Sequence, residues 1–386
     1  MQEWLFLLLP VAAASGWFAA KSHYTKKYLI DHSQALRRAY CRGLNYLLSE
    51  KTDKAIETFA NLLVSDYETI ETHIALGNLY RRRGELEKAI QIHEKLISQD
   101  KLNEEQRTTA YFELGMDYLR GGLFDRAEVI FSQLTDHGVY RKAALQQLLQ
   151  IYLHERDWRK ASHSARQLAV IGKLTRGESV AQFLCELAEE TLAADQDEEA
   201  FRCLEEALRE DPACVRANLL IAKMRMREGR FEEAMQALRQ VESQNPAYLP
   251  EVLEPLRVCH ERLNRPVVEL MGYLGYLYET YGFHSAALAL AEQLRAERGV
   301  GRAAEHLQRV LEGQPSLKTL SALTGLLLED GMASPREALI RIDRAVDRMS
   351  AGKPRYACIK CGFSGAELHW CCPSCRCWES TRPVDH

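Results

Sequence analysis

Helix-breaking residues and charge of one sign are scarce in this sequence. The 386 residues include only 11 prolines and 22 glycines, which favours helices and excludes an all-β protein. The 50 basic and 54 acidic side chains leave a net charge of −4, so the chain lacks the basic field that holds nucleic acid. Apolar residues make up 46% and charged residues 27%, which excludes a largely disordered chain and a multi-span membrane protein.

Recognisable catalytic motifs are also missing. The sequence has no Gly-x-Ser-x-Gly turn, no phosphate-binding glycine loop and no His-Glu-x-x-His motif. Single histidines occur in different parts of the chain, and we expect structural rather than ligand roles for them: His73, His93, His137, His154, His163, His260, His284 and His306. The sequence therefore predicts a protein that is not an enzyme, and it nominates no catalytic residue.

One apolar run is long enough to enter a membrane. Trp4 to Ala20 reads WLFLLLPVAAASGWFAA, seventeen residues without a charge, and as a helix it would extend about 25 Å. Only Glu3 precedes the run as a charged residue, whereas Lys21 and further basic residues follow it, so the positive side is C-terminal. We predict a transmembrane anchor at residues 1–20, a basic juxtamembrane linker at 21–35, and the bulk of the chain on the cytoplasmic side of the membrane.

Two alternatives to the anchor remain. A cleaved signal peptide is favoured by the small residues from Ala12 to Gly16 and opposed by the missing positive residues before the run. It would release the chain as an envelope-side chaperone. A buried core helix is opposed by the absence of a polar face.

The middle of the chain repeats itself. Gly43, Tyr46, Ala55 and Phe59 recur 34 residues later as Gly77, Tyr80, Ala89 and His93. Further copies follow at Gly115 to Phe131, Tyr152 to Ala161, Ala200 to Pro212 and Ala234 to Pro246, with weaker ones at Gly275 to Ala287 and Ala303 to Pro315. This pattern resembles the tetratricopeptide repeat over about eight copies between residues 36 and 318. The resemblance implies helix pairs stacked into a superhelix with a groove lined by the first helices.

Small residues in this pattern are a packing requirement. The Gly or Ala of a first helix and the Ala of a second helix mark where the two approach closely, and a proline ends the second helix. Contacts to a partner then fall on variable first-helix positions, for which the candidates are Asn45, Asn78, Arg81, Asp117, Arg120 and Gln150.

The eleven cysteines fall into two groups. Five isolated ones are expected to be small buried apolar residues: Cys41, Cys185, Cys203, Cys214 and Cys259. The other six lie between Cys358 and Cys377. Such an uneven distribution argues against a disulfide scaffold and favours a reducing compartment.

The C-terminal cysteines predict a metal site. Cys358-x-x-Cys361 and Cys372-Pro-x-Cys375 are separated by ten residues, in a tail of about 30 residues that is too short for its own apolar core. We predict that these four cysteines bind one ion tetrahedrally, leaving Cys371 and Cys377 as spare thiols. Four sulfurs suit zinc or iron, and zinc is preferred. The segment 350–386 resembles a rubredoxin-type knuckle or a zinc ribbon.

The order of these parts carries a wider resemblance. An N-terminal LFLLLPVAAA, an array containing LGNLYRRRGELEKAI and ALQQLLQIY, and a terminal KPRYACIKCGF with CPSC resemble the lipopolysaccharide assembly protein B family. That implies an all-α tetratricopeptide-repeat superhelix, residues 36–349, between an N-terminal transmembrane helix and a small rubredoxin-like or zinc-ribbon metal knuckle, residues 350–386.

The resemblance also implies a function and partners. The family is a membrane-tethered adaptor without activity of its own, which promotes degradation of the lipid A pathway deacetylase by the membrane protease FtsH and works with other lipopolysaccharide assembly membrane proteins. We expect the knuckle to dock on the last repeats or on the protease. The alternative from another class is electron transfer through a rubredoxin-like iron centre. The oligomeric state, a homodimer included, stays open.

Overall fold

The computed structural model describes residues 17, 18, 21, 38–64, 69–99, 102–136, 138–172, 180–314, 316–329, 340 and 354–384. The predicted anchor and linker lie outside these residues except for Trp17, Phe18 and Lys21, and the predicted helical stretch from Pro335 to Met349 lies outside them except for Ile340. Within the described part of the chain, no helix has the length and apolar character needed to cross a membrane.

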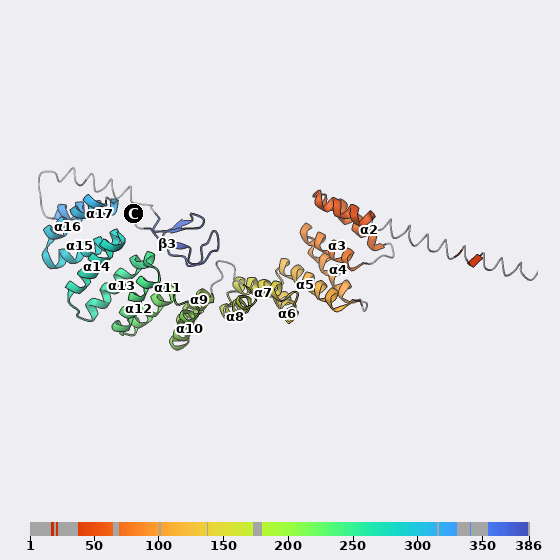
Figure 1. The fold of residues 1–386 in the computed structure, drawn as a ribbon, viewed down its shortest axis with the longest axis horizontal. Helices are drawn as coiled ribbons and strands as arrows, with labels where there is room; N and C mark the ends of the chain where they lie inside the picture. The colour runs from red at the N-terminus through yellow and green to blue at the C-terminus, as the bar shows by residue number, and fades with distance from the viewer. Residues whose placement is uncertain are drawn as a thin grey trace, which may run out of the picture. The chain divides into compact units, whose positions relative to one another are not determined.

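The chain divides into two compact units, residues 1–151 and 152–386. The first unit contains a helical stretch at 38–48, and its further helices are α2 (Thr52–Val64), α3 (Ile70–Arg83), α4 (Leu86–Ile97), α5 (Glu104–Arg120), α6 (Phe124–Leu134) and the start of α7 (Arg141–Glu155). From α2 to α6 each helix contacts the next, and α3 also contacts α5, so first helices of successive pairs touch as tetratricopeptide repeats require (Figure 1).

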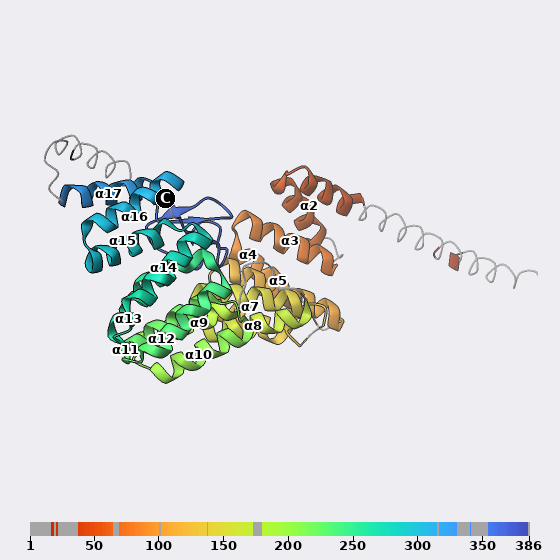
Figure 2. The same cartoon turned by 60° about the vertical axis from the view of Figure 1, so that its left-hand side comes forward.

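The second unit continues the same architecture. Its helices are α8 (Trp158–Ile171), α9 (Val180–Ala193), α10 (Asp197–Glu210), α11 (Val215–Arg227), α12 (Phe231–Gln244), η1 (Pro246–Tyr248), α13 (Leu249–Arg262), α14 (Val267–Tyr281), α15 (His284–Arg298), α16 (Val300–Gly313) and α17 (Leu317–Glu329). Figures 1 and 2 show α8 to α17 stacked in chain order. Helices α10 and α12 end two residues before Pro212 and Pro246, as predicted.

The predicted close approaches are present in the first three helix pairs. A Cβ built on Gly43 would lie 2.7 Å from the Phe59 ring, and one on Gly115 would lie 2.9 Å from the Phe131 ring. At Gly77 the neighbour is His93, 2.4 Å away. These distances are shorter than any carbon contact allows, so glycine is required at each of the three positions.

The prediction for the weak copy at Gly275 to Ala287 is wrong, because it takes the helix of Gly275 as a first helix and the helix of Ala287 as a second helix. Helix α9 contacts α11, α11 contacts α13, α13 contacts α15 and α15 contacts α17, so the first-helix series runs through α13 and α15 and makes α14 a second helix. A Cβ on Gly275 would meet only Leu290, at 3.9 Å. The glycine spacing was misleading here because α14 is rich in glycine and tyrosine without making the close approach.

A small three-stranded sheet completes the second unit. Strands β1 (Tyr356–Cys358), β2 (Ser364–Gly365) and β3 (Thr381–Pro383) form an antiparallel sheet in the order β2-β1-β3, with Tyr356 opposite Gly365 and Pro383. We call residues 354–384 the knuckle. Its strands are too short to make a core alone, so what stabilises it must lie in its cysteines and in its contacts with the helices.

Candidate metal centre

Four cysteines of the knuckle converge on one point. Cys358 ends β1 and Cys361 follows in the turn to β2, while Cys372 and Cys375 flank a second turn. The sulfur atoms of Cys358 and Cys375 are 3.7 Å apart, as are those of Cys361 and Cys372. All four lie within 4.8 Å of one another, and among the described residues they are the group of ligand atoms placed to hold a metal ion.

These distances fit a tetrahedral sulfur site. Metal–sulfur bonds of about 2.3 Å give sulfur–sulfur edges of about 3.8 Å in a regular tetrahedron. The two measured pairs, at 3.7 Å, match such edges. The residues present therefore fit zinc or iron, with all four positions filled by protein and none left open for a substrate.

The backbone around the first turn prepares thiolates. Desolvation opposes ionisation of Cys358, but its hydrogen bond with the Ser380 hydroxyl and those from the amides of Cys361 and Lys360 lower the pKa of its thiol to about 6. The amide of Phe363 likewise lowers the pKa of Cys361. The thiolate is the form that binds a metal, so this turn favours the binding form at neutral pH.

The two remaining cysteines of the tail lie outside the group. Cys371 forms an isolated bridge with Trp378, and its sulfur lies 3.6 Å from the carbonyl oxygen of Arg376. Cys377 contributes its carbonyl oxygen, which accepts hydrogen bonds from the Cys372 amide and the Ser380 hydroxyl. The structure therefore uses their backbone to shape the second turn, while four other sulfurs already complete the tetrahedron.

Aromatic side chains dock the knuckle on the helices of its own unit. The ring of Trp370 stacks on Tyr248, with centroids 5.3 Å apart, and the Arg216 guanidinium lies over the Trp370 ring, 5.8 Å from its centroid. Trp378 meets Phe183 of α9 edge to face at 5.5 Å. Such pairs contribute roughly 0.5–1.5 kcal/mol each beyond their burial. The docking site thus lies on α9, α11 and η1.

Hydrogen bonds fix the orientation of the docked knuckle. Tyr248 donates to the carbonyl of Thr381 at 3.0 Å, and Gln182 donates to the carboxylate of Glu379 at 2.5 Å. Tyr356 donates to Glu251 of α13 at 2.8 Å. The expectation of docking on the last repeats needs correction, because these aromatic and polar anchors lie on α9 to α13 rather than on α14 to α17.

Two predicted groove contacts serve a different purpose. Asp117 is fully buried, and its carboxylate meets His93 Nδ1 at 2.5 Å and Arg81 Nη1 at 2.9 Å. Arg81 also pairs with Glu113 at 2.6 Å. These residues join α3, α4 and α5 internally, so Arg81 and Asp117 are not free for a partner. Asn45, Arg120 and Gln150 are exposed, and Asn78 is half-buried.

The isolated cysteines follow the prediction with one exception. Cys185, Cys203, Cys214 and Cys259 are buried, whereas Cys41 is exposed. Cys41 lies two residues before Gly43, and the sequence around it does not distinguish it from the four buried cysteines. Its exposure depends on which face of its helix packs against the neighbouring helix.

The docking residues on the helices carried no sequence signal. Arg216 is only 3% exposed and pairs with Glu186 at 2.9 Å and Glu189 at 3.1 Å. Tyr248 is 1% exposed. A buried arginine on a first helix would have predicted that another segment of the same chain lies against it. The sequence alone does not show that Arg216 is buried.

Comparison with known proteins places the chain in a family. Models of the tetratricopeptide repeat match residues 72–106 and 191–254. Lipopolysaccharide assembly protein B of Escherichia coli strain K12 is 38% identical over 387 residues, covering 100% of this chain and 98% of that protein. The protein of the same name from Haemophilus influenzae is 35% identical over 395 residues, covering 100% and 99%.

Solved structures are more distant. The structure of Naa15/Naa10 bound to HypK-THB is 13% identical, with a TM-score of 0.42, and the match covers 80% of this chain and 58% of that one. The family assignment rests instead on the curated relatives, which align with this chain over its whole length. The chain belongs to the lipopolysaccharide assembly protein B family.

Proposed function

We propose that this chain is a non-catalytic adaptor in lipopolysaccharide assembly that brings other proteins together. The observation that carries this proposal is that the metal-ligating and titratable side chains of the described residues hold the fold together. Four thiols form a closed site without an open coordination position, and the buried His93, Asp117 and Arg81 join helices to one another. The relatives' name supplies the process, lipopolysaccharide assembly.

The metal ion in this proposal is structural. Cys358, Cys361, Cys372 and Cys375 hold zinc, with iron as the alternative occupant. The ion supplies the folding energy that a knuckle of this size lacks, and the folded knuckle then presents Trp370 and Trp378 to the helices. Metal analysis separates the two ions, because a zinc protein is colourless and redox-silent whereas a reducible iron centre would favour electron transfer.

The adaptor acts at a membrane in this proposal. Residues 4–20 span the inner membrane, 21–35 lie beside the headgroups, and the repeats and knuckle face the cytoplasm. Tethering raises the effective concentration of membrane-bound partners. The partners are the protease FtsH, the deacetylase of the lipid A pathway as its client, and other lipopolysaccharide assembly membrane proteins.

The half-life of the deacetylase tests this function. In cells that lack the endogenous chain, the full-length protein should restore rapid turnover, and a version without residues 1–20 should restore it only weakly. A version lacking the repeats at 38–171 should leave the deacetylase stable. Undiminished turnover with the repeat-less version, or turnover of a small molecule by the purified chain, would overturn the proposal.

A further inference from the structure

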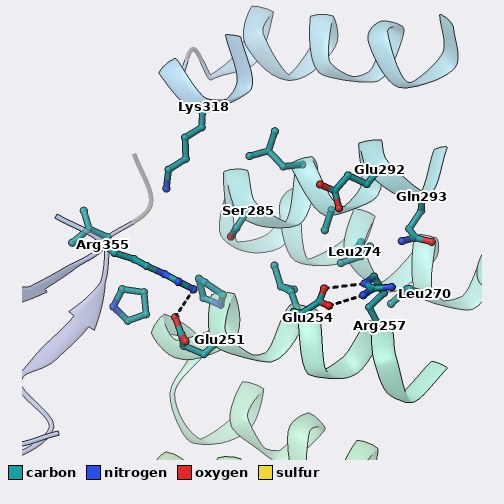
Figure 3. Close-up of a pocket in the computed structure, with 16 residues that line it drawn as sticks. Glu251, Glu254, Arg257, Leu270, Leu274, Ser285, Glu292, Gln293, Lys318 and Arg355 are labelled. Carbon is teal, nitrogen blue, oxygen red and sulfur yellow. Dashed lines mark hydrogen bonds and ion pairs between the residues drawn. The ribbon is translucent and has the colours of Figure 1, made fainter. Parts of the chain in front are cut away.

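A cavity in the second unit is shared by the repeats and the knuckle. It has a volume of about 360 Å³ and is lined by α13, α14, α15, the first turn of α17 and two segments of the knuckle, at Arg355 and at Pro383–Val384 (Figure 3). We call it the shared pocket. It is separate from the metal centre, and its size falls within the range of about 300–1,000 Å³ that is typical of ligand sites.

The floor of the shared pocket is apolar. Leu253, Leu270 and Leu274 line it and are at most 8% exposed, and Leu288 and Ala289 of α15 continue the surface. Figure 3 shows Leu270 and Leu274 deep between α13 and α15. Apolar side chains that bind to such a surface are removed from water, and this contributes a favourable free energy of roughly 25 cal/mol per Å² of apolar surface buried.

The rim of the shared pocket has a positive side. Lys318 extends from α17 toward the side where Arg355 of the knuckle lies. Among the residues that the structure describes, no ion pair involves Lys318, and Arg355 reaches Glu251 only at 3.7 Å while remaining 67% exposed. Of these two cations only Arg355 forms an ion pair with a described residue, so this side of the rim carries a net positive charge.

The opposite side of the pocket carries balanced and acidic groups. Arg257 is bound to Glu254 at 2.5 Å and also pairs with Glu261, so its charge is neutralised. Glu292 lies on α15, on the same side as Gln293. The pocket thus offers positive charge at one end and negative charge at the other, across an apolar floor. That pattern suits a peptide better than an acylated anion, which carries negative charge alone.

We propose that the shared pocket binds a short segment of a partner protein. Apolar side chains of the segment lie on the leucine floor, and a carboxylate next to them lies between Lys318 and Arg355. This inference rests on the adaptor function proposed above and names the site at which the adaptor holds one partner. The partner is defined by this chemistry: an apolar segment flanked by an acidic residue.

The wall that carries Arg355 depends on the folded knuckle. Arg355 precedes Tyr356, whose hydroxyl is bonded to Glu251, and the Arg355 carbonyl accepts a hydrogen bond from the Val384 amide at 2.8 Å. Tyr356 in β1 also pairs with Pro383 in β3. The metal knuckle therefore supplies one side of the partner site, which gives the docked knuckle a role in recognition.

Peptide selection against the full-length chain in lipid nanodiscs tests the proposal. The probe is a phage library of random dodecapeptides, and the strongest clone is then made as a synthetic peptide. We expect an apolar cluster beside Asp or Glu, and an affinity at least tenfold lower for Lys318→Glu. Replacing the acidic residue of the peptide by lysine should restore binding to Lys318→Glu. Arg209→Glu, an exposed reversal on α10, is the matched control and should bind as the unsubstituted chain does.

Four results would overturn the proposal. The first is a selected peptide without acidic residues, or none at all; the second is equal binding to Lys318→Glu and Arg209→Glu. The third is saturable binding of dodecyl phosphate that is lost in Lys318→Glu and that the peptide does not compete for. That result would mean that the pocket binds an anionic amphiphile. Undiminished deacetylase turnover with Lys318→Glu would also reject the pocket as the partner site while leaving the adaptor function intact.

Discussion

The helical repeats and the knuckle use cysteine in opposite ways. In the repeats, burial raises the pKa of the Cys259 thiol to about 11, and a hydrogen bond with Cys214 together with burial raises that of Cys185. In the knuckle, hydrogen bonding to the Ser380 hydroxyl and to the amides of Cys361 and Lys360 lowers the pKa of Cys358 to about 6. The comparison shows that backbone amides favour the thiolate at the first turn of the knuckle, whereas burial keeps the Cys259 thiol protonated.

The same two regions differ in how they are held together. Each helix pair gains its stability from neighbours that cover its apolar face. The knuckle has three strands of two or three residues and relies on four sulfurs and on Trp370 and Trp378 against the helices. Substitutions in the repeats and in the knuckle should therefore differ in how much of the structure they destabilise.

Removing one sulfur should have the largest effect. We expect Cys361→Ser to abolish stoichiometric metal binding and to unfold the knuckle, because a structural zinc site of this kind contributes on the order of 10 kcal/mol. Metal content and hydrogen exchange at residues 354–384 measure this. Cys203→Ser, at a buried cysteine of α10, is the control and should keep the metal. Retention of one tightly held ion by Cys361→Ser would mean that Cys371 or Cys377 is a ligand.

Acid should remove the same metal reversibly. Because the pKa of Cys358 is lowered from 9.0 to about 6, its thiolate is stabilised at high pH, and this stabilisation is lost as the pH falls through about 6. We expect metal release at or below that pH, measured with a chromophoric chelator, while far-ultraviolet circular dichroism of the helices changes little. Metal content that does not depend on pH down to about pH 2 would contradict the role of these thiolates.

Loss of a docking aromatic should separate docking from metal binding. Trp370→Ala removes the contacts with Tyr248 and Arg216, and we expect a loss of about 2–3 kcal/mol in docking. The metal should remain bound while amides at 354–384 exchange faster and proteases cut the knuckle sooner. Ile359→Ala, at a 57% exposed residue of the knuckle, should change neither. Equal protection in both variants would show that Trp370 does not hold the knuckle.

The buried polar cluster of the first unit offers a smaller test. His93→Phe restores the aromatic residue found at Phe59 and Phe131 but leaves Asp117 without one of its partners. We expect a destabilisation of about 1–3 kcal/mol, seen as faster hydrogen exchange in α3 to α5. His163→Phe, at an exposed position of α8, should have almost no effect. A stabilised His93→Phe variant would mean that Asp117 is satisfied by Arg81 alone.

Two glycine substitutions should have opposite signs. Gly77→Ala forces a methyl group into His93 and should cost about 1–3 kcal/mol, whereas Gly301 in α16 has nothing within 4 Å of its added Cβ. Gly301→Ala should therefore stabilise its helix by up to about 1 kcal/mol. Thermal unfolding of the two variants compares them. Equal effects would contradict the close packing assigned to the first three helix pairs.

Particular residues show what local pattern can predict. Gly43, Gly77 and Gly115 were identified from their 34- and 38-residue spacing, since only glycine allows the contact they make and the requirement recurs in each copy. Gly275 precedes Tyr278 and Ala287 by the same intervals that separate Gly43 from Tyr46 and Ala55, but it does not make that contact. The interval between residues shows that two positions belong to the same sequence pattern, but it does not show which helix each position packs against.

The chain's composition and motifs by themselves determined the helical repeats and the four converging thiols, because helix pairing and tetrahedral ligation depend on residues close together in sequence. Only the tertiary structure decided where the knuckle docks, since Gln182 and Glu379 are 197 residues apart and nothing local links them. It also decided that Arg81 and Asp117 face each other instead of a partner, and that Lys318 and Arg355 border one pocket. Burial and long-range contact arise only when distant segments pack together, so no short stretch of sequence contains them.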